Sequence, residues 1–361
     1  MLDQKTVVSD DASQIQFSWL LATAVSVVFC QSGFNSGTES SMSARIANII
    51  VTCTKRKSVP AEDCLQLGQV AGSTVSDLAK QWISRLQKAN SLPRPADELY
   101  SGDHWQIARS FPEVASGRNV QVRLWVCSAG YGLIPSWAPL KPYSATFSTH
   151  HKDSVLRRLA TLSGGSIHEW WSILAKWSGP VPGEPRTLTE LARNAKRAPL
   201  IFVASDVYLR AVGADLEDAR NALADPRLLT IVSGGGAPSG ELRSNQLPCN
   251  ARLQSLLGGA LMSLNVRVVR RILSQVERWP LRCDDLAAEF QKLIDAQPEF
   301  EQPQRRQLTD EKVQQFVRRQ LAKNPSLCAS PLLRRLRDSG FACEQKRFGK
   351  QFLQVRKQFH E

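Results

Sequence analysis

The sequence predicts an α/β protein, with a mixed sheet flanked by helices and a pocket at the strand ends, to which a small all-helical domain is attached. Short apolar runs rich in β-branched residues alternate with segments of helical periodicity, which is typical of the α/β class. Hydrophobic residues make up 42% of the 361 residues, enough for one large domain and a smaller one.

Positive charge is unevenly distributed along the chain. Residues 301–361 contain fourteen Lys/Arg and six Asp/Glu, a net charge of +8, whereas the first 300 residues carry +5 of the total of +13. A basic module attached to a nearly balanced body indicates a polyanionic partner, and we expect that partner to be DNA.

The cysteines and the N-terminal segment exclude several classes of protein. The eight cysteines form no C-x-x-C pair and have no histidine at metal-ligand spacing, so we expect no metal and no cofactor. Several lie in apolar runs, as free thiols do in a reducing compartment, so we expect a cytoplasmic protein. Residues 17–30 are apolar but too short for a membrane span, and no membrane partner is expected. We expect residues 1–41 to be an extension outside the fold, which an upstream start codon would explain.

The α/β domain is expected to cover residues 42–295. Buried strands are predicted at 46–52, 122–127, 200–205 and 228–232, where apolar residues run without interruption. Apolar residues at helical spacing predict helices between these strands and after them. The predicted helices lie at 63–90, 155–177, 188–197, 215–224 and 284–295, with one more that starts at His104 and one that contains Gly258 and Gly259.

The stretch from 125 to 148 predicts a binding pocket. A strand ends there in S-A-G-Y-G, whose glycines let backbone N–H groups approach a ligand closely. Tyrosines beside small and hydroxyl-bearing residues suit a flat polar ligand such as a nucleobase, although ordinary turns with partly buried tyrosines would give the same pattern. The residues expected to line the base pocket are Ser128, Gly130, Tyr131, Gly132, Tyr143, Thr146, Ser205, Tyr208 and Asn265.

A cationic turn follows the first strand, in the order Cys53-Thr54-Lys55-Arg56-Lys57. Ligands of open α/β sheets bind at the carboxyl ends of the strands. We therefore expect Cys53, Lys55 and Lys57 to contact phosphate, with a solvated turn as the alternative.

A polar linker at 296–307 separates the body from a basic helical DNA-binding domain at 308–361. Three short helices are expected there, at 312–321, from Ser330 to Gly340, and at 344–355, with an apolar core between them. This layout is that of a helix-turn-helix unit with its recognition helix beginning at Glu344; a basic solvated surface is the alternative. The expected DNA contacts are Arg334, Arg335, Arg337, Lys346, Arg347 and Lys350.

Four motifs in sequence order resemble those of the bacterial peroxide-stress family of DNA-binding proteins, and of relatives encoded in phage-defence and deazaguanine DNA-modification clusters. The turn at 53–57 is similar to a Ser/Cys-x-x-Lys turn of that family. The other three are Ser128-Ala129-Gly130-Tyr131-Gly132-Leu133, Pro142-Tyr143 and Ala204-Ser205-Asp206-Val207-Tyr208. The resemblance covers residues 44–272 and implies a DNA-associated fold. Among such defence relatives are DNA glycosylases and enzymes that edit a 7-deazaguanine in DNA.

The leading hypothesis is a phage-defence DNA glycosylase that flips a modified base out of DNA and excises it. A carboxylate near C1′ would stabilise the sugar cation, and Asp206 is the first candidate, followed by Asp103. In the alternative interpretation, Asp103 caps a helix instead. Asn265 is a candidate to position the water, with helix capping or packing as its alternative role.

Two other functions use the same features. One is an enzyme that hydrolyses a substituent on a 7-deazaguanine-type base, with Cys53 or Cys127 as nucleophile. The other is a non-catalytic sensor of modified DNA. The sequence has neither the zinc signature of base deaminases nor a G-x-x-x-x-G-K-[ST] phosphate loop, which argues against a deaminase and an ATPase.

Overall fold

A mixed six-stranded sheet forms the centre of the α/β body. The computed structural model describes residues 44–162, 164–235, 238, 240–301 and 304–358, so the expected N-terminal extension lies outside the described residues. The strand order is β4-β3-β1-β6-β7-β8, and all neighbours are parallel except the antiparallel pair of β3 and β4. The strands are β1 (Arg45–Thr52), β3 (Val120–Ser128), β4 (Gly132–Pro135), β6 (Leu200–Ala204), β7 (Leu229–Ser233) and β8 (Gln246–Leu247).

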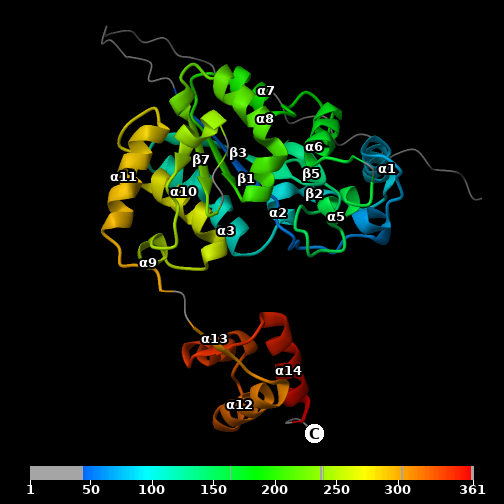
Figure 1. Ribbon diagram of the computed structural model, residues 1–361, viewed down its shortest axis with the longest axis vertical. Coiled ribbons are helices and arrows are strands. Elements are labelled where there is room, and N and C mark those ends of the chain that lie inside the picture. Colours follow the sequence, from blue (N-terminus) through cyan, green and yellow to red (C-terminus); the bar gives the residue numbers. More distant parts are fainter. Residues whose placement is uncertain (1–43, 163, 236–237, 239, 302–303, 359–361) are drawn as a thin grey trace, which may run out of the picture. The chain divides into compact units, whose positions relative to one another are not determined.

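The central strands are apolar because helices cover both faces of the sheet (Figure 1). β1, β6 and β7 are buried along most or all of their length, and the prediction of an α/β protein with buried strands is confirmed. The helices packed together on one face are α6 (Ile167–Lys176), α7 (Leu188–Asn194) and α8 (Asp206–Ala222). Those on the other face are α4 (Phe111–Ser116), α10 (Leu264–Ser274) and α11 (Cys283–Asp295).

Two helices are shorter than the sequence predicted. In the 63–90 segment, α1 (Val75–Lys88) begins only after Thr74, whose side chain accepts a hydrogen bond from the amide of Asp77. Two 3₁₀ turns precede it, η1 (Asp63–Leu65) and η2 (Leu67–Gln69). The 155–177 segment forms α5 (Val155–Leu159) and α6, because Gly164 between them has a φ of +71°.

Two further expectations about helices are wrong. The segment with Gly258 and Gly259 forms no single helix, because both glycines have positive φ and separate α9 (Leu253–Leu257) from η5 (Leu261–Ser263) and α10. The helix predicted at 215–224 begins nine residues earlier, so Asp206 is the first residue of α8 and does not extend the strand end.

Short elements complete the body. Helix α3 (Asp103–Arg109) follows α2 (Ala96–Leu99), and β2 (Arg94–Pro95) pairs with β5 (Pro139–Leu140). Two 3₁₀ turns, η3 (Pro226–Leu228) and η4 (Gly240–Asn245), flank β7. Among the residues that the structure describes, no helix is long and apolar enough to span a membrane.

The C-terminal residues form three helices around a hydrophobic cluster of their own. The helices are α12 (Asp310–Lys323), α13 (Ala329–Asp338) and α14 (Gln345–Gln358), and β9 (Arg306–Gln307) pairs with β10 (Phe341–Ala342). Thr309 caps α12 by accepting a hydrogen bond from the amide of Lys312, and Gly340, with a φ of +84°, follows α13. The buried residues of this cluster are Val313, Val317, Leu321, Leu332, Leu333, Leu336, Cys343, Phe348, Phe352 and Val355. We call residues 308–358 the helical module.

Candidate functional site

Polar side chains gather where the neighbouring parallel strands β1 and β3 end. Thr52 pairs with Cys127 in the register, so Cys53 and Ser128 follow at the same edge of the sheet. The amide of Cys53 donates to the carbonyl of Cys127 at 3.0 Å, which continues the pairing to the last residue. The two turns expected to bind a ligand are therefore brought together.

The turn after β3 is held from several directions. The Ser128 hydroxyl accepts hydrogen bonds from the amides of Gly130 at 3.2 Å and Tyr131 at 3.1 Å. Buried indole groups donate to the carbonyls of the same turn, Trp82 to Gly130 at 2.8 Å and Trp170 to Ala129 at 2.9 Å. The backbone N–H groups that were expected to face a ligand are thus used inside the turn.

A buried arginine connects this turn to helix α6 through hydrogen bonds. The guanidinium of Arg186, only 7% exposed, donates to the carbonyls of Tyr131, Leu133, Leu174 and Trp177. Burial lowers the pKa of Arg186 to about 10, so it remains cationic at neutral pH. Its guanidinium also explains Gly132, because a Cβ on that residue would lie 3.0 Å from Arg186 Nη2. We missed Arg186 in the sequence because its partners lie in distant segments.

Three buried hydroxyl groups form one hydrogen-bonded group beside the turn, which we call the hydroxyl cluster: Tyr100, Ser128 and Tyr143. The Tyr143 oxygen lies 2.6 Å from Ser128 Oγ and 2.8 Å from the Tyr100 oxygen. Burial raises the pKa of both tyrosines well above the ordinary value, so both phenols are neutral. Gly130 permits this packing, since a Cβ there would lie 2.5 Å from the Tyr143 ring.

Lys57 lies against the rings of the hydroxyl cluster. Its Nζ is 4.2 Å from the centroid of the Tyr143 ring and 5.7 Å from that of Tyr100. The ammonium also donates to the carbonyl of Thr54 at 3.3 Å. Burial lowers the pKa of Lys57, and the acidic groups of Cys53 and Asp153 partly oppose this effect. The structure therefore places Lys57 on the aromatic rings, whereas Lys55 is exposed.

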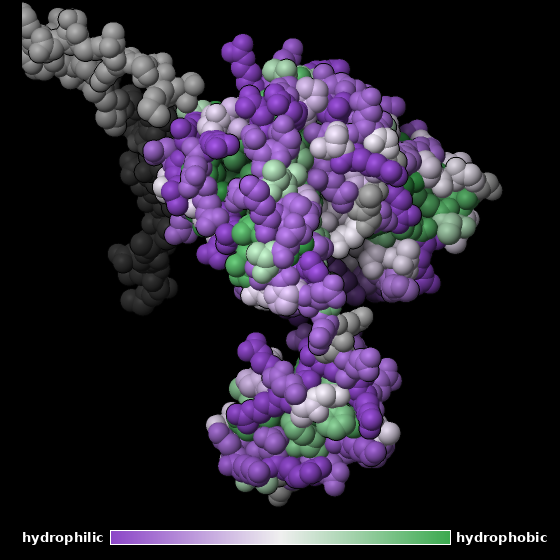
Figure 2. All heavy atoms as spheres, turned by 60° about the vertical axis from the view of Figure 1, so that its left-hand side comes forward, coloured by the Kyte–Doolittle hydropathy of each residue, from purple (hydrophilic) through white to green (hydrophobic). Residues whose placement is uncertain are grey.

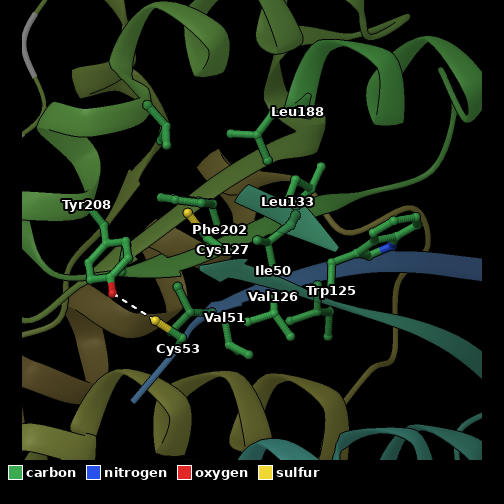
Figure 3. Close-up of a cluster of buried hydrophobic side chains, with 14 of the residues drawn as sticks. Ile50, Val51, Cys53, Trp125, Val126, Cys127, Leu133, Leu188, Phe202 and Tyr208 are labelled. Atoms are coloured by element: carbon green, nitrogen blue, oxygen red, sulfur yellow. Dashed lines mark hydrogen bonds between the residues drawn. The ribbon is translucent and has the colours of Figure 1, made fainter. Parts of the chain in front are cut away.

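Cys53 and Cys127 have different surroundings although they lie at the ends of paired strands. The Cys53 thiol lies 3.1 Å from the Tyr208 hydroxyl, a contact marked by the dashed line in Figure 3. The Tyr208 ring packs edge-on against Phe147. Cys127 is fully buried near Phe202 (Figure 3), and burial raises its pKa well above the ordinary value. A thiol in such an environment is a poor nucleophile.

The sequence analysis missed a buried carboxylate, that of Asp153. It is 1% exposed and accepts hydrogen bonds from the amide of Gly68 at 2.9 Å and from the Ser144 hydroxyl at 2.6 Å. His151 Nδ1 is 3.7 Å away, but it accepts a hydrogen bond from the Asp153 amide at 3.1 Å. Because that lone pair is occupied, and because burial lowers the pKa of His151, we interpret this contact as one of a neutral imidazole.

The two expected catalytic carboxylates are paired with arginines. Asp206 has a side chain that is 49% exposed and forms an ion pair of 3.2 Å with Arg210 in the next turn of α8. Asp103 accepts from the Ser263 hydroxyl and forms an ion pair of 2.9 Å with Arg267. Within the described residues, no hydrogen bond or ion pair joins either carboxylate to the hydroxyl cluster.

The other expected base-pocket residues are mostly engaged in local contacts. The Tyr131 hydroxyl bonds to both backbone groups of Lys141, and its ring packs between Tyr143 and Trp177. Thr146 Oγ1 accepts from the amide of Ser148, and Asn265 Oδ1 accepts from the amide of Val266. Ser205 is the exposed residue before α8. Of the nine, the structure brings Ser128, Gly130, Tyr131, Gly132 and Tyr143 into one group.

The expected DNA contacts of the helical module fall into two groups. Arg337 donates to the carbonyl of Cys343 at 2.9 Å, and Arg347 forms an ion pair of 2.6 Å with Asp310. These two cations therefore hold the module together. The remaining four are exposed: Arg334, Arg335, Lys346 and Lys350. Hydrophilic residues dominate the surface visible in Figure 2.

In comparisons with family models, curated proteins and solved structures, the chain matches none. The resemblance described above therefore remains a prediction that depends on the four motifs.

Proposed function

We propose that this protein is a DNA glycosylase that removes a modified base and leaves an abasic site. One observation carries the proposal: an amine, that of Lys57, lies on the Tyr143 ring beside the hydroxyl cluster, at the carboxyl ends of β1 and β3. A flipped base needs an aromatic surface and hydrogen-bonding groups for its polar edge. Tyr143 and the hydroxyl cluster would supply both once the Lys57 side chain moves off the ring.

The geometry leads us to revise which residues would act on the sugar. Asp206 and Asp103 each form an ion pair with an arginine, so the proposal gives them no catalytic role. Tyr100 and Tyr143 are almost fully buried, whereas Lys57 is half-buried above Tyr143. An entering nucleotide would therefore meet the Lys57 amine before it reaches the hydroxyl cluster.

The helical module would hold the DNA as a helix-turn-helix unit, with α14 as recognition helix. Its buried face contains Phe348, Phe352 and Val355, which leaves Lys346 and Lys350 on the exposed side, one turn apart. Exposed cations on a helix that enters the major groove would contact the phosphates beside it. The proposal places the protein in the cytoplasm, where the free cysteines among the described residues would stay reduced.

Replacing Lys346 and Lys350 together by alanine should weaken DNA binding in a salt-dependent manner. Each lost phosphate contact lowers the slope of log K against log salt concentration by about 0.9, so the double variant should lose about 1.8. Fluorescence anisotropy with a labelled duplex at several salt concentrations measures the slope. The control is the double variant Lys88→Ala with Lys176→Ala, two exposed lysines of the body, which should keep the original slope. Equal slopes in both variants would remove α14 from the proposed interface.

The glycosylase activity is tested with DNA from a phage that carries hypermodified bases and with unmodified DNA of the same sequence. We expect free modified base, detected by mass spectrometry, and alkali-labile breaks only in the modified DNA. Release of no base from either DNA would contradict the proposal.

One contact favours a second candidate, hydrolysis of a substituent on a 7-deazaguanine-type base with Cys53 as nucleophile. Cys53 lies at the end of β1 within hydrogen-bonding distance of Tyr208 and near Lys57. In the same assay this enzyme would alter the mass of the nucleoside and leave the glycosidic bond intact. Unchanged nucleosides together with tight binding would indicate a sensor.

A further inference from the structure

Lys57 is held in a way that suits covalent chemistry better than phosphate binding. A phosphate-binding lysine is usually a solvated, mobile cation. Lys57 instead pairs with Tyr100 in an antiparallel bridge, and its Nζ lies 4.2 Å from the centroid of the Tyr143 ring. Lys55, two residues earlier and exposed, is the better phosphate contact.

Burial of Lys57 favours the neutral amine. Burial lowers its pKa, which raises the fraction of unprotonated, nucleophilic nitrogen near neutral pH. The groups that oppose this effect are the Tyr143 ring and the acidic groups of Cys53 and Asp153. Cys53 and Asp153 are also engaged elsewhere, Cys53 with Tyr208 and Asp153 with Gly68 and Ser144. No carboxylate among the described residues lies within ion-pair distance of Lys57.

We propose that Lys57 is the nucleophile of the glycosylase and forms a Schiff base with the sugar, so that the enzyme is also a DNA lyase. This proposal rests on the proposed function. The lone pair of Nζ forms a bond to C1′, and the bond between C1′ and the base breaks, with its electron pair leaving on the base. The neutral hydroxyl cluster can hydrogen-bond the departing base.

The following steps need water as the only further reactant. The nitrogen lone pair forms C1′=N⁺ while the sugar C1′–O4′ bond breaks and O4′ takes up the proton lost from Nζ. The departed base, which carries the electron pair of the broken bond, then takes up a proton from C2′. The electrons of that C–H bond form a double bond between C2′ and C3′ and expel the phosphate at C3′, which cuts the strand. Water finally hydrolyses the imine and restores the amine.

Borohydride reduction tests the proposal, because it converts the Schiff base into a stable amine that joins protein and DNA. Full-length wild type, Lys57→Ala, Lys57→Arg and the control Lys88→Ala, an exposed lysine of the body outside the proposed site, are each incubated with phage DNA carrying hypermodified bases and, separately, with a duplex that already contains an abasic site. Wild type and Lys88→Ala should give the cross-linked species on both DNAs, with the adduct on Lys57 in the peptide mass spectrum. Both Lys57 variants should lose it by more than about 100-fold.

The two DNAs separate failure of this inference from failure of the proposed function. Free modified base without any cross-link would leave a glycosylase that uses water and would overturn the role of Lys57. A Lys57 cross-link to abasic DNA alone, without release of modified base, would support the nucleophile and contradict the glycosylase. No cross-link with either DNA would overturn the inference. Since only the neutral amine reacts, the rate of cross-linking by wild type should rise with pH and level off below the ordinary lysine pKa.

Discussion

Replacing Arg186 by methionine should lower the free energy of unfolding of the α/β body by about 3 kcal/mol or more. The guanidinium donates to four carbonyl oxygens of the β3–β4 turn and of the α6 end. Methionine fills a similar volume but leaves those buried acceptors without a donor. Urea unfolding followed by tryptophan fluorescence measures the effect on the body alone, because every tryptophan lies before residue 280.

Arg193→Met is the matched control. Arg193 is exposed in the last turn of α7, and its replacement should change the free energy of unfolding by less than about 0.5 kcal/mol. Arg186→Lys should behave more like Arg186→Met than like wild type, because one ammonium group cannot reach four carbonyls in the geometry of a planar guanidinium. Unchanged stability of both Arg186 variants would show that the turn does not depend on this side chain.

Replacing Gly130 by alanine should destabilise the body by about 1–3 kcal/mol and abolish base release. The new Cβ would lie 2.5 Å from Cε2 and 2.8 Å from Cδ2 of Tyr143, so the ring must move away. Moving it breaks the hydrogen bonds of Tyr143 to Ser128 and Tyr100 and shifts the surface under Lys57. Urea unfolding and the base-release assay measure the two effects.

Replacing Gly213 by alanine should stabilise the body, the opposite of the effect expected at Gly130. Gly213 lies inside α8, and a Cβ there would meet nothing within 4 Å. Alanine in a helix interior is favoured over glycine by about 0.5–1 kcal/mol, so Gly213→Ala should gain stability and keep activity. If Gly130→Ala were as stable and as active as Gly213→Ala, Tyr143 would not need the position described here.

The strands could be predicted because their apolar pattern is local. β1, β6 and β7 are covered on both faces, so their sequences are uninterrupted apolar runs. Helix ends were harder to predict, because a periodic apolar pattern continues through Gly164, Gly258 and Gly259. These glycines have positive φ and stand between helices in the structure. The helical period indicates which residues face the core but not where the backbone turns.

The candidate site was predictable only where it follows a strand. Ser128 comes from the turn that ends β3, and the glycines next to it indicated a close approach. Asp153 and Arg186 could not be predicted, because their partners are far away in the sequence; Asp153, for example, accepts from the amide of Gly68, 85 residues before it. Lys57 was expected to be a phosphate contact because its sequence neighbours are cationic. Its ring partners come from other segments, so no local pattern reveals them.

The amides that bind Ser128 fix the direction of its hydrogen bond to Tyr143. A hydroxyl oxygen accepts through two lone pairs, and the amides of Gly130 and Tyr131 occupy both, so Ser128 must give its hydrogen to Tyr143. Tyr143 can in turn donate to the Tyr100 oxygen, 2.8 Å away. In that arrangement the Tyr100 hydrogen finds no free lone pair on Ser128 Oγ, which is 3.5 Å away, so it is the hydroxyl hydrogen of the cluster that a ligand would capture. In the proposed glycosylase, a base edge that faces Tyr100 would therefore present a carbonyl oxygen or an unprotonated ring nitrogen, and an amino group in that position would be selected against.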